Sequence, residues 1–261
     1  MELFSYAICA PGLVRSDNQD NLYINGTYRG DITNNSVFLH SDKVSKQGLY
    51  AVADGMGGET HGELAAIVTV QAMDAITPCD GGYGIVQYLI ERNAVICDLI
   101  NKNGGARIGS TFAGLFINGN SADIINIGDS RVYLSRGGVF SQLSRDHSSI
   151  QQMIDLGIIS KEAAHTHPDR HRLTQHLGIF PSEMVIEPYI ATIAIEANDL
   201  FLLCSDGLTD MLIDSAIDSI LNSPGTVKQK AEALYTAALR NGGKDNITVL
   251  LIQAKKGGLF R

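Results

Sequence analysis

Five aspartates stand beside short apolar runs that have the composition of β-strands. They are Asp20, Asp54, Asp129, Asp206 and Asp245; three come just after such a run and two just before one. If these strand ends share one edge of a sheet, the carboxylates converge. Two carboxylates about 4 Å apart repel by roughly 4 kcal/mol at an effective dielectric of 20, so a converging set requires protons or cations between its members. The pattern therefore predicts a cation site.

The donor types favour a hard divalent ion at this site. Ligation by carboxylate, backbone carbonyl and water oxygens suits Mg²⁺ or Mn²⁺, and no Cys/His set in the sequence has the spacing of a zinc or copper site. Gly55 directly follows Asp54 and has no side chain to keep its carbonyl away from an ion. The alternative is a purely structural one, because Asp-Gly after a strand is also a common turn dipeptide.

Two other chemistries are disfavoured by spacing. The glycine-rich piece Gly55–Thr60 would need a glycine at Thr60 to be a dinucleotide-binding loop, and no P-loop motif exists. The four cysteines, Cys9, Cys79, Cys97 and Cys204, form no C-x-x-C pair and lie mostly in apolar surroundings. We therefore expect reduced core thiols.

The elements that must position these acids are short strands with helices between them. We predict strands at 3–9, 21–25, 48–53, 110–117, 122–127, 131–135, 200–204 and 247–253, and helices at 63–76, 85–100 and 226–239. The strands around 110–143 follow one another through short turns, which is typical of an antiparallel meander. This order favours an α+β sandwich over a doubly wound parallel sheet.

Composition bounds the class of protein. The 261 residues are 44% hydrophobic and 18% charged, which excludes a disordered or coiled-coil chain. The 20 basic and 28 acidic side chains give a net charge of −8, which argues against a nucleic-acid binder. With neither a signal peptide nor a membrane-length apolar run, we expect a cytoplasmic protein that does not bind membranes.

Seven short motifs occur in an order that resembles the bacterial branch of the PP2C-type (PPM) metal-dependent serine/threonine protein phosphatases. They begin at Arg15 (R-x-x-N-Q-D), Val52 (V-A-D-G-M-G-G), Gly109 (G-S-T), Gly128 (G-D-S-R), Leu143 (L-S-x-D-H-S), Ser205 (S-D-G-L) and Asp245 (D-N-I-T). The resemblance covers about residues 5–253. It implies one domain over 1–261, a four-layer α/β-β/α sandwich of two antiparallel sheets flanked by helices.

The resemblance also implies a role for each acid. Asp54 would bridge two Mn²⁺ or Mg²⁺ ions, the carbonyl of Gly55 would bind one of them, and Asp206 and Asp245 would bind the other. Asp20 would act mainly through metal-bound water, and Asp129, with Asp206, would hold a weaker third ion. Arg15 would receive the substrate phosphate, because a guanidinium fits two phosphoryl oxygens. A hydroxide bridging the two ions would then attack phosphorus directly.

One position departs from the family. The eukaryotic branch has a histidine shortly after the Asp-Gly pair, proposed as general acid, whereas this chain has Met56. Either metal-bound water or a histidine from elsewhere would protonate the leaving group. We interpret Asp146-His147-Ser148 as a structural turn rather than as the source of that proton.

The polar stretch 147–188 matches the flap that bacterial members carry beside the metal site, and we expect a helical excursion there. Its run His165–Arg172 is rich in imidazole and guanidinium, which leaves a zinc site open as an alternative. We expect instead a partly cationic flap whose Arg170 and Arg172 guide phosphorylated substrate.

The resemblance implies partners as well as chemistry. The substrates would be phosphoserine and phosphothreonine proteins made by a cognate Ser/Thr kinase, and the enzyme would act as a monomer. Two rivals remain: a catalytically inactive domain that binds a phosphoprotein or metal, and a scaffold whose Asp-Gly pairs are only turns.

Overall fold

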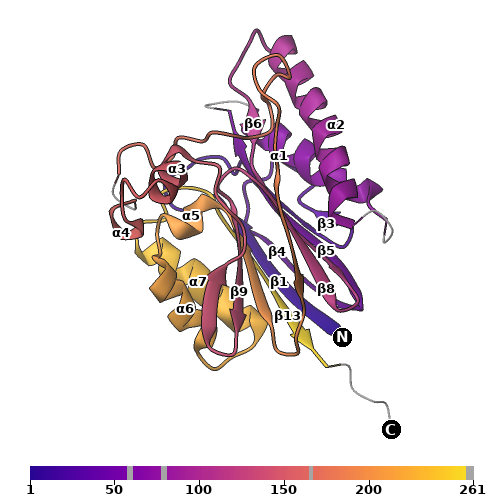
Figure 1. Ribbon diagram of the computed structural model, residues 1–261, viewed down its shortest axis with the longest axis vertical. Coiled ribbons are helices and arrows are strands. Elements are labelled where there is room, and N and C mark those ends of the chain that lie inside the picture. The colour runs from indigo at the N-terminus through magenta and orange to yellow at the C-terminus, as the bar shows by residue number, and fades with distance from the viewer. Residues whose placement is uncertain (58–60, 78–80, 165–166, 257–261) are drawn as a thin grey trace.

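Two antiparallel sheets lie at the centre of the molecule (Figure 1). The computed structural model describes residues 1–57, 61–77, 81–164 and 167–256. The first sheet has the order β10-β9-β12-β13-β1-β4, from β1 (Glu2–Ala10), β4 (Phe38–Ser45), β9 (Arg131–Arg136), β10 (Val139–Gln142), β12 (Leu200–Cys204) and β13 (Ile247–Lys255). The second has the order β11-β8-β7-β5-β2-β3, from β2 (Asp20–Ile24), β3 (Thr27–Tyr28), β5 (Gln47–Met56), β7 (Phe112–Asn118), β8 (Ser121–Ile127) and β11 (Tyr189–Ala194). The short β6 (Gly109–Ser110) pairs with the end of β5.

Helices cover the outer face of each sheet (Figure 1). The second sheet is covered by α1 (Gly62–Val70), a 3₁₀ turn at Gln71–Ala75, and α2 (Gly81–Lys102). The first sheet is covered by α5 (Asp206–Thr209), α6 (Asp214–Asn222) and α7 (Val227–Arg240). Two further helices, α3 (Ser149–Asp155) and α4 (Lys161–Ala164), lie in the flap.

Three apolar layers hold these elements together. Between the two sheets, side chains such as Leu22, Val52 and Leu250 are fully buried. A second layer joins the sheet that contains β5 to α1 and α2, and a third joins the sheet that contains β13 to α5, α6 and α7. This arrangement confirms the four-layer α/β-β/α sandwich expected from the sequence.

The predicted meander around 110–143 is split between the two sheets. β7 pairs with β8, and β9 pairs with β10, but β8 and β9 belong to different sheets. The expectation of one continuous meander was therefore wrong, because the turn Gly128–Ser130 carries the chain across the sandwich. Asp129 lies in this crossing.

The flap region begins with helices and continues without them. After α4 the chain from 167 to 188 contains turns and isolated bridges, so the expected helical excursion covers only the first part of 147–188. Leu177 is fully buried and bridges Ser110, and Gly178 N–H donates to Asn93 Oδ1 of α2 at 2.6 Å. The later half of the segment is thus attached to the α2 side of the molecule.

Two further expectations concern thiols and membranes. Cys9, Cys97 and Cys204 are buried free cysteines, and Cys79 lies outside the described residues. In the part of the chain that the structure describes, no helix combines the length and the apolar character needed to cross a bilayer.

Candidate metal centre

The pairing of β2 with β5 places two of the five acids side by side. Asp20 and Asp54 are direct partners in the antiparallel register. Asp20 is fully buried, and its Oδ2 accepts hydrogen bonds from Ser205 Oγ and Thr248 Oγ1, both at 2.7 Å. These two hydroxyls come from the ends of β12 and β13, so one carboxylate joins the two sheets at this edge.

The second oxygen of Asp20 has no protein partner. Oδ1 is buried and accepts no hydrogen bond from the described residues. Burial raises the pKa of Asp20 to about 7, although the bonds from Ser205 and Thr248 act in the opposite direction. A buried carboxylate oxygen without a donor is costly unless a proton, a water or a cation satisfies it.

Asp54 is fixed through its backbone. Its N–H donates to Thr111 Oγ1 at 3.0 Å, and its carbonyl accepts from the Thr111 N–H at 2.9 Å. Burial raises the pKa of Asp54 well above its ordinary value, and the charges of the other four acids, Asp20, Asp206, Asp129 and Asp245, raise it further. The charges of all four acids therefore act on the Asp54 carboxylate, as we expected from the positions of the acids at strand ends.

Gly55 occupies a place where a side chain would not fit. A Cβ there would lie 2.1 Å from the carbonyl oxygen of Gly62 and 2.6 Å from that of Gln19. The chain around Asp54 can approach α1 this closely only with glycine at 55. Gly58 and Thr60, which complete the glycine-rich piece, lie outside the described residues.

The remaining acids come from three connections. Asp206 is the first residue of α5, Asp129 lies in the crossing between β8 and β9, and Asp245 lies just before β13. The pKa of Asp129 is raised well above its ordinary value, first by burial and then by the charge of Asp206. Asp129 and Asp206 therefore interact, which is the pair that the resemblance assigns to a third ion.

A cavity of about 790 Å³ brings the predicted site residues together. Its lining includes Arg15, Asp54, Gly55, Asp129, Asp206 and Asp245, together with Met56, Thr111, His171 and Leu173. Asp20 does not line it. Arg15 reaches Asp245, with Nη2 2.8 Å from Oδ2, and its side chain is 57% exposed. The predicted phosphate-binding arginine thus lies at the mouth of the cavity, in an ion pair that the sequence did not indicate.

The flap arginines lie in different places. Arg170 faces Asp210, with Nε 4.0 Å from Oδ1, beside a smaller cavity of about 110 Å³. Arg172 is exposed and lines neither cavity; its carbonyl accepts from Ser149 N–H at 2.9 Å. Of the two predicted guides, Arg170 alone is brought to the site.

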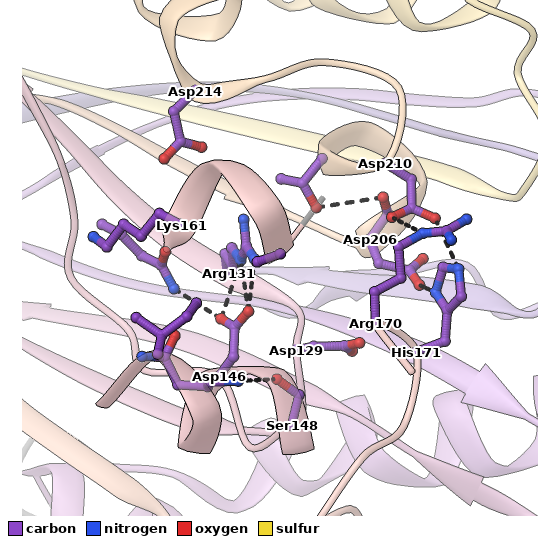
Figure 2. A pocket seen from close by; sticks show the side chains of 15 residues that line it. Asp129, Arg131, Asp146, Ser148, Lys161, Arg170, His171, Asp206, Asp210 and Asp214 are labelled. Carbon is purple, nitrogen blue, oxygen red and sulfur yellow. Dashed lines mark hydrogen bonds and ion pairs between the residues drawn. The ribbon is translucent and has the colours of Figure 1, made fainter. Parts of the chain in front are cut away.

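His171 is the flap residue that sequence reasoning did not single out. Its Nδ1 lies 3.7 Å from Asp206 Oδ2 and its Nε2 lies 3.5 Å from Asp210 Oδ2 (Figure 2). The neighbouring carboxylates of Asp206 and Asp210 raise the pKa of His171, although burial and the charge of Arg170 act against them. The sequence held one indication of this contact. Asp210 comes four residues after Asp206, one helical turn away, so the two carboxylates can face the same partner.

His171, Asp206 and Asp210 also form a group that could hold a metal ion, with ligand atoms within 4.8 Å of one another. The zinc alternative in the flap rested partly on His165, which lies outside the described residues. His147 lines neither cavity, and burial lowers its pKa.

The donor set fits two hard divalent cations. Asp20 contributes an oxygen that accepts no hydrogen bond from the described residues, and the cavity is lined by oxygen donors. Burial, and after it repulsion by the neighbouring acids, raises the pKa values of Asp20 and Asp54. Cations offset this repulsion, and Mn²⁺ or Mg²⁺ prefers these ligands.

Comparison with known proteins agrees with this geometry. The sequence model described as "Protein phosphatase 2C" matches residues 23–152. The serine/threonine phosphatase stp of Listeria innocua is 33% identical over 254 residues, covering 93% of this chain and 92% of that protein. The serine/threonine protein phosphatase PstP of Mycobacterium tuberculosis is 31% identical over 245 residues, and the match covers 92% of this chain but only 43% of PstP.

Solved structures show the same fold. The crystal structure of the M. tuberculosis phosphatase PstP/Ppp superposes with a TM-score of 0.82 at 31% identity, over 98% of this chain and 100% of that one. A structure described as the PstP catalytic domain with two manganese ions has a TM-score of 0.79 at 29% identity, over 98% and 100% of the two chains. From its sequence relatives and its fold, the chain belongs to the PP2C (PPM) family of serine/threonine protein phosphatases.

Proposed function

We propose that this protein hydrolyses phosphoserine and phosphothreonine in proteins with the help of two Mn²⁺ or Mg²⁺ ions. The observation that carries the proposal is the Asp20–Asp54 pair across β2 and β5, with a buried Asp20 oxygen that accepts no hydrogen bond within the described part of the chain. Three further acids and a guanidinium belong to the same site. A scaffold whose Asp-Gly pairs were only turns would have no need to gather these charges.

The ions would be held by residues at the end of β5 and in three connections. Asp54 would bridge them, the Gly55 carbonyl would bind one, and Asp206 and Asp245 would bind the other. Asp129 with Asp206 would hold a third, weaker ion. When bound, the ions supply Lewis acidity, which makes hydroxide available near neutral pH for direct attack on phosphorus and offsets the phosphoryl charge.

The side chains at the cavity mouth would bind and orient the substrate. Arg15 is the exposed cation at the cavity that holds Asp54, and its guanidinium can bind two phosphoryl oxygens in one plane. Arg15 would leave Asp245 and bind the substrate phosphate when the Asp245 carboxylate binds a metal ion. Met56 lines the same cavity and cannot donate a proton, so the leaving-group oxygen would receive its proton from water or from another residue.

The substrates would be proteins phosphorylated by a Ser/Thr kinase, whose signal a monomeric phosphatase would reverse. This follows the named function of the relatives, which are serine/threonine phosphatases. Arg170 and His171, which border the metal centre from the flap, would contact the phosphoprotein.

The test is phosphate release from a phosphothreonine peptide and from its phosphotyrosine counterpart. We expect Mn²⁺-dependent release from the first, little from the second, and loss of activity in EDTA that Mn²⁺ restores. Asp206→Ala should lower kcat by at least about 10²–10³, the usual effect of deleting one preorganised electrostatic group. Asp218→Ala, on α6 and outside the lining of both cavities, is the matched control and should leave kcat unchanged.

One result would favour a rival function, and another would exclude the metal-dependent mechanism. Binding of the phosphopeptide without turnover would indicate an inactive phosphoprotein-binding domain. Activity that survives both EDTA and Asp206→Ala would remove the metal-dependent mechanism altogether.

A further inference from the structure

The turn that presents Asp129 is held by a residue from another part of the chain. Gly128 N–H donates to Nδ1 of His147 at 3.2 Å, and Gly128 O accepts from the His147 N–H at 2.8 Å. Both backbone groups of the residue before Asp129 are therefore bound to one histidine, 19 positions away in the sequence.

This turn has little freedom to use other contacts. Gly128 is buried with φ +97°, and a Cβ there would lie 2.7 Å from Thr111 Cγ2. The neighbouring Ser130 Oγ shares a hydrogen bond of 2.7 Å with Thr111 Oγ1, the atom that also binds Asp54 N–H. Asp54 and Asp129 are thus connected through Thr111 and Ser130, and His147 closes the other side of the turn.

His147 also stands at the root of the flap. Its carbonyl accepts from Thr174 N–H at 2.8 Å, Ser148 and Leu173 form a β-bridge, and Ser149 N–H donates to Arg172 O. The two ends of the segment that contains α3, α4 and His171 therefore meet at His147, which hydrogen-bonds Gly128. The support of Asp129 and the root of the flap therefore share one residue, His147.

We propose that His147 is a positioning residue, which sets the Gly128–Asp129 turn for cation binding and couples this turn to the root of the flap. The part that concerns the ion rests on the proposed function, which assigns Asp129 as a ligand. His147 acts through Gly128 and touches neither ion nor substrate. Residues behind a ligand commonly change metal affinity by about 10–100-fold when they are removed.

The test compares His147→Ala with His147→Asn, because an asparagine Oδ1 can accept from Gly128 N–H where Nδ1 does. In the metal-free protein, hydrogen exchange at the Gly128 and Thr174 amides should become faster in His147→Ala and stay close to the parent in His147→Asn. In a Mn²⁺ titration by calorimetry, the weakest site should lose affinity by about tenfold or more in His147→Ala only. His40→Ala, in the middle of β4, is the control for a histidine away from the site.

Each outcome bears on a separate claim. Unchanged exchange at Gly128 in His147→Ala, or an asparagine variant as impaired as the alanine one, would overturn the positioning role. Faster exchange with unchanged Mn²⁺ affinity would overturn the part that concerns the ion. Absence of phosphatase activity in the parent would contradict the proposed function, yet the exchange measurement would remain decisive for His147.

Discussion

Asp54 owes its place to Thr111 more than to any contact of its own carboxylate. Thr111 is 1% exposed and binds both the N–H and the carbonyl of Asp54. These two bonds hold the backbone at Asp54 and thus the direction of its Cα–Cβ bond, which starts the carboxylate toward the cavity that Asp54 lines.

Thr111→Val tests this support with a near-isosteric change. Valine keeps the backbone bond to Asp54 O but removes the acceptor of Asp54 N–H and the partner of Ser130 Oγ, which should lower the free energy of unfolding by about 1–3 kcal/mol. We also expect weaker Mn²⁺ activation of hydrolysis. Thr192→Val on β11, which removes an exposed hydroxyl bonded to Asp123 of β8, should change the unfolding free energy by less than about 0.5 kcal/mol. Equal effects of the two substitutions in a denaturant titration would refute the role of Thr111 in supporting Asp54.

The raised pKa of Asp20 makes the stability of the metal-free protein depend on pH. The folded chain keeps the proton up to a pKa of about 7, whereas an unfolded Asp releases it near pH 4. Between these values the folded state binds more protons than the unfolded state. The free energy of unfolding must therefore fall as pH rises through this window.

Asp20→Asn removes this contribution, since an amide does not titrate. In EDTA, the Tm of the parent minus that of the variant should decrease from about pH 5 to about pH 7.5. Thermal unfolding of both proteins at several pH values measures this difference in Tm. A difference that stays constant, or that grows with pH, would show that Asp20 does not retain its proton in the fold.

At the scale of elements, the strand-end pattern was the most informative part of the sequence. Antiparallel strands that end in Asp or begin with Asp alternate in direction, so their acids reach one edge, as the register of Asp20 with Asp54 shows. The pattern cannot reveal which sheet each strand joins. That is why the crossing at Gly128–Ser130 was mistaken for a turn of a meander.

Other elements left no clear pattern. β4 alternates half-buried and exposed residues at the edge of its sheet, and its polar sequence lacks the apolar run of an internal strand. The ion pair of Arg15 with Asp245 and the approach of His171 to Asp206 join residues far apart in the chain. Such contacts arise from tertiary packing and cannot be predicted from the spacing of residues along the sequence.

The loop that carries Arg15 depends on one buried amide. Asn246 accepts from Gln19 N–H at 2.8 Å and donates to the carbonyls of Pro11 and Asp17 at 3.1 and 2.7 Å. Asn246→Ala should lower the free energy of unfolding by about 1–3 kcal/mol and raise the KM for a phosphopeptide more than it lowers kcat.

The matched control is Asn241→Ala, which removes a single exposed amide bond to Met211 O at 2.8 Å. It should leave KM unchanged. A fall in kcat with an unaltered KM in Asn246→Ala would mean that the loop does not position the phosphate-binding arginine.

At the scale of the molecule, the chain carries a net charge of −8, and the five acids of the site account for only part of it. The body should repel acidic phosphopeptides and attract basic ones, and salt should weaken both effects. Raising the NaCl concentration should therefore increase kcat/KM for a phosphopeptide with acidic flanks and decrease it for one with basic flanks, relative to a neutral peptide. Parallel decreases for all three peptides in a steady-state assay would argue against steering by the net charge.

The central claim is that the two sheets bring five carboxylates to one edge to hold a binuclear metal centre. Equilibrium dialysis against Mn²⁺, with elemental analysis of the protein, counts the ions directly. We expect at least two Mn²⁺ per parent chain and a loss of at least one in Asp54→Asn, with the fold retained by circular dichroism. Fewer than two ions in the parent, or a full complement in Asp54→Asn, would contradict it.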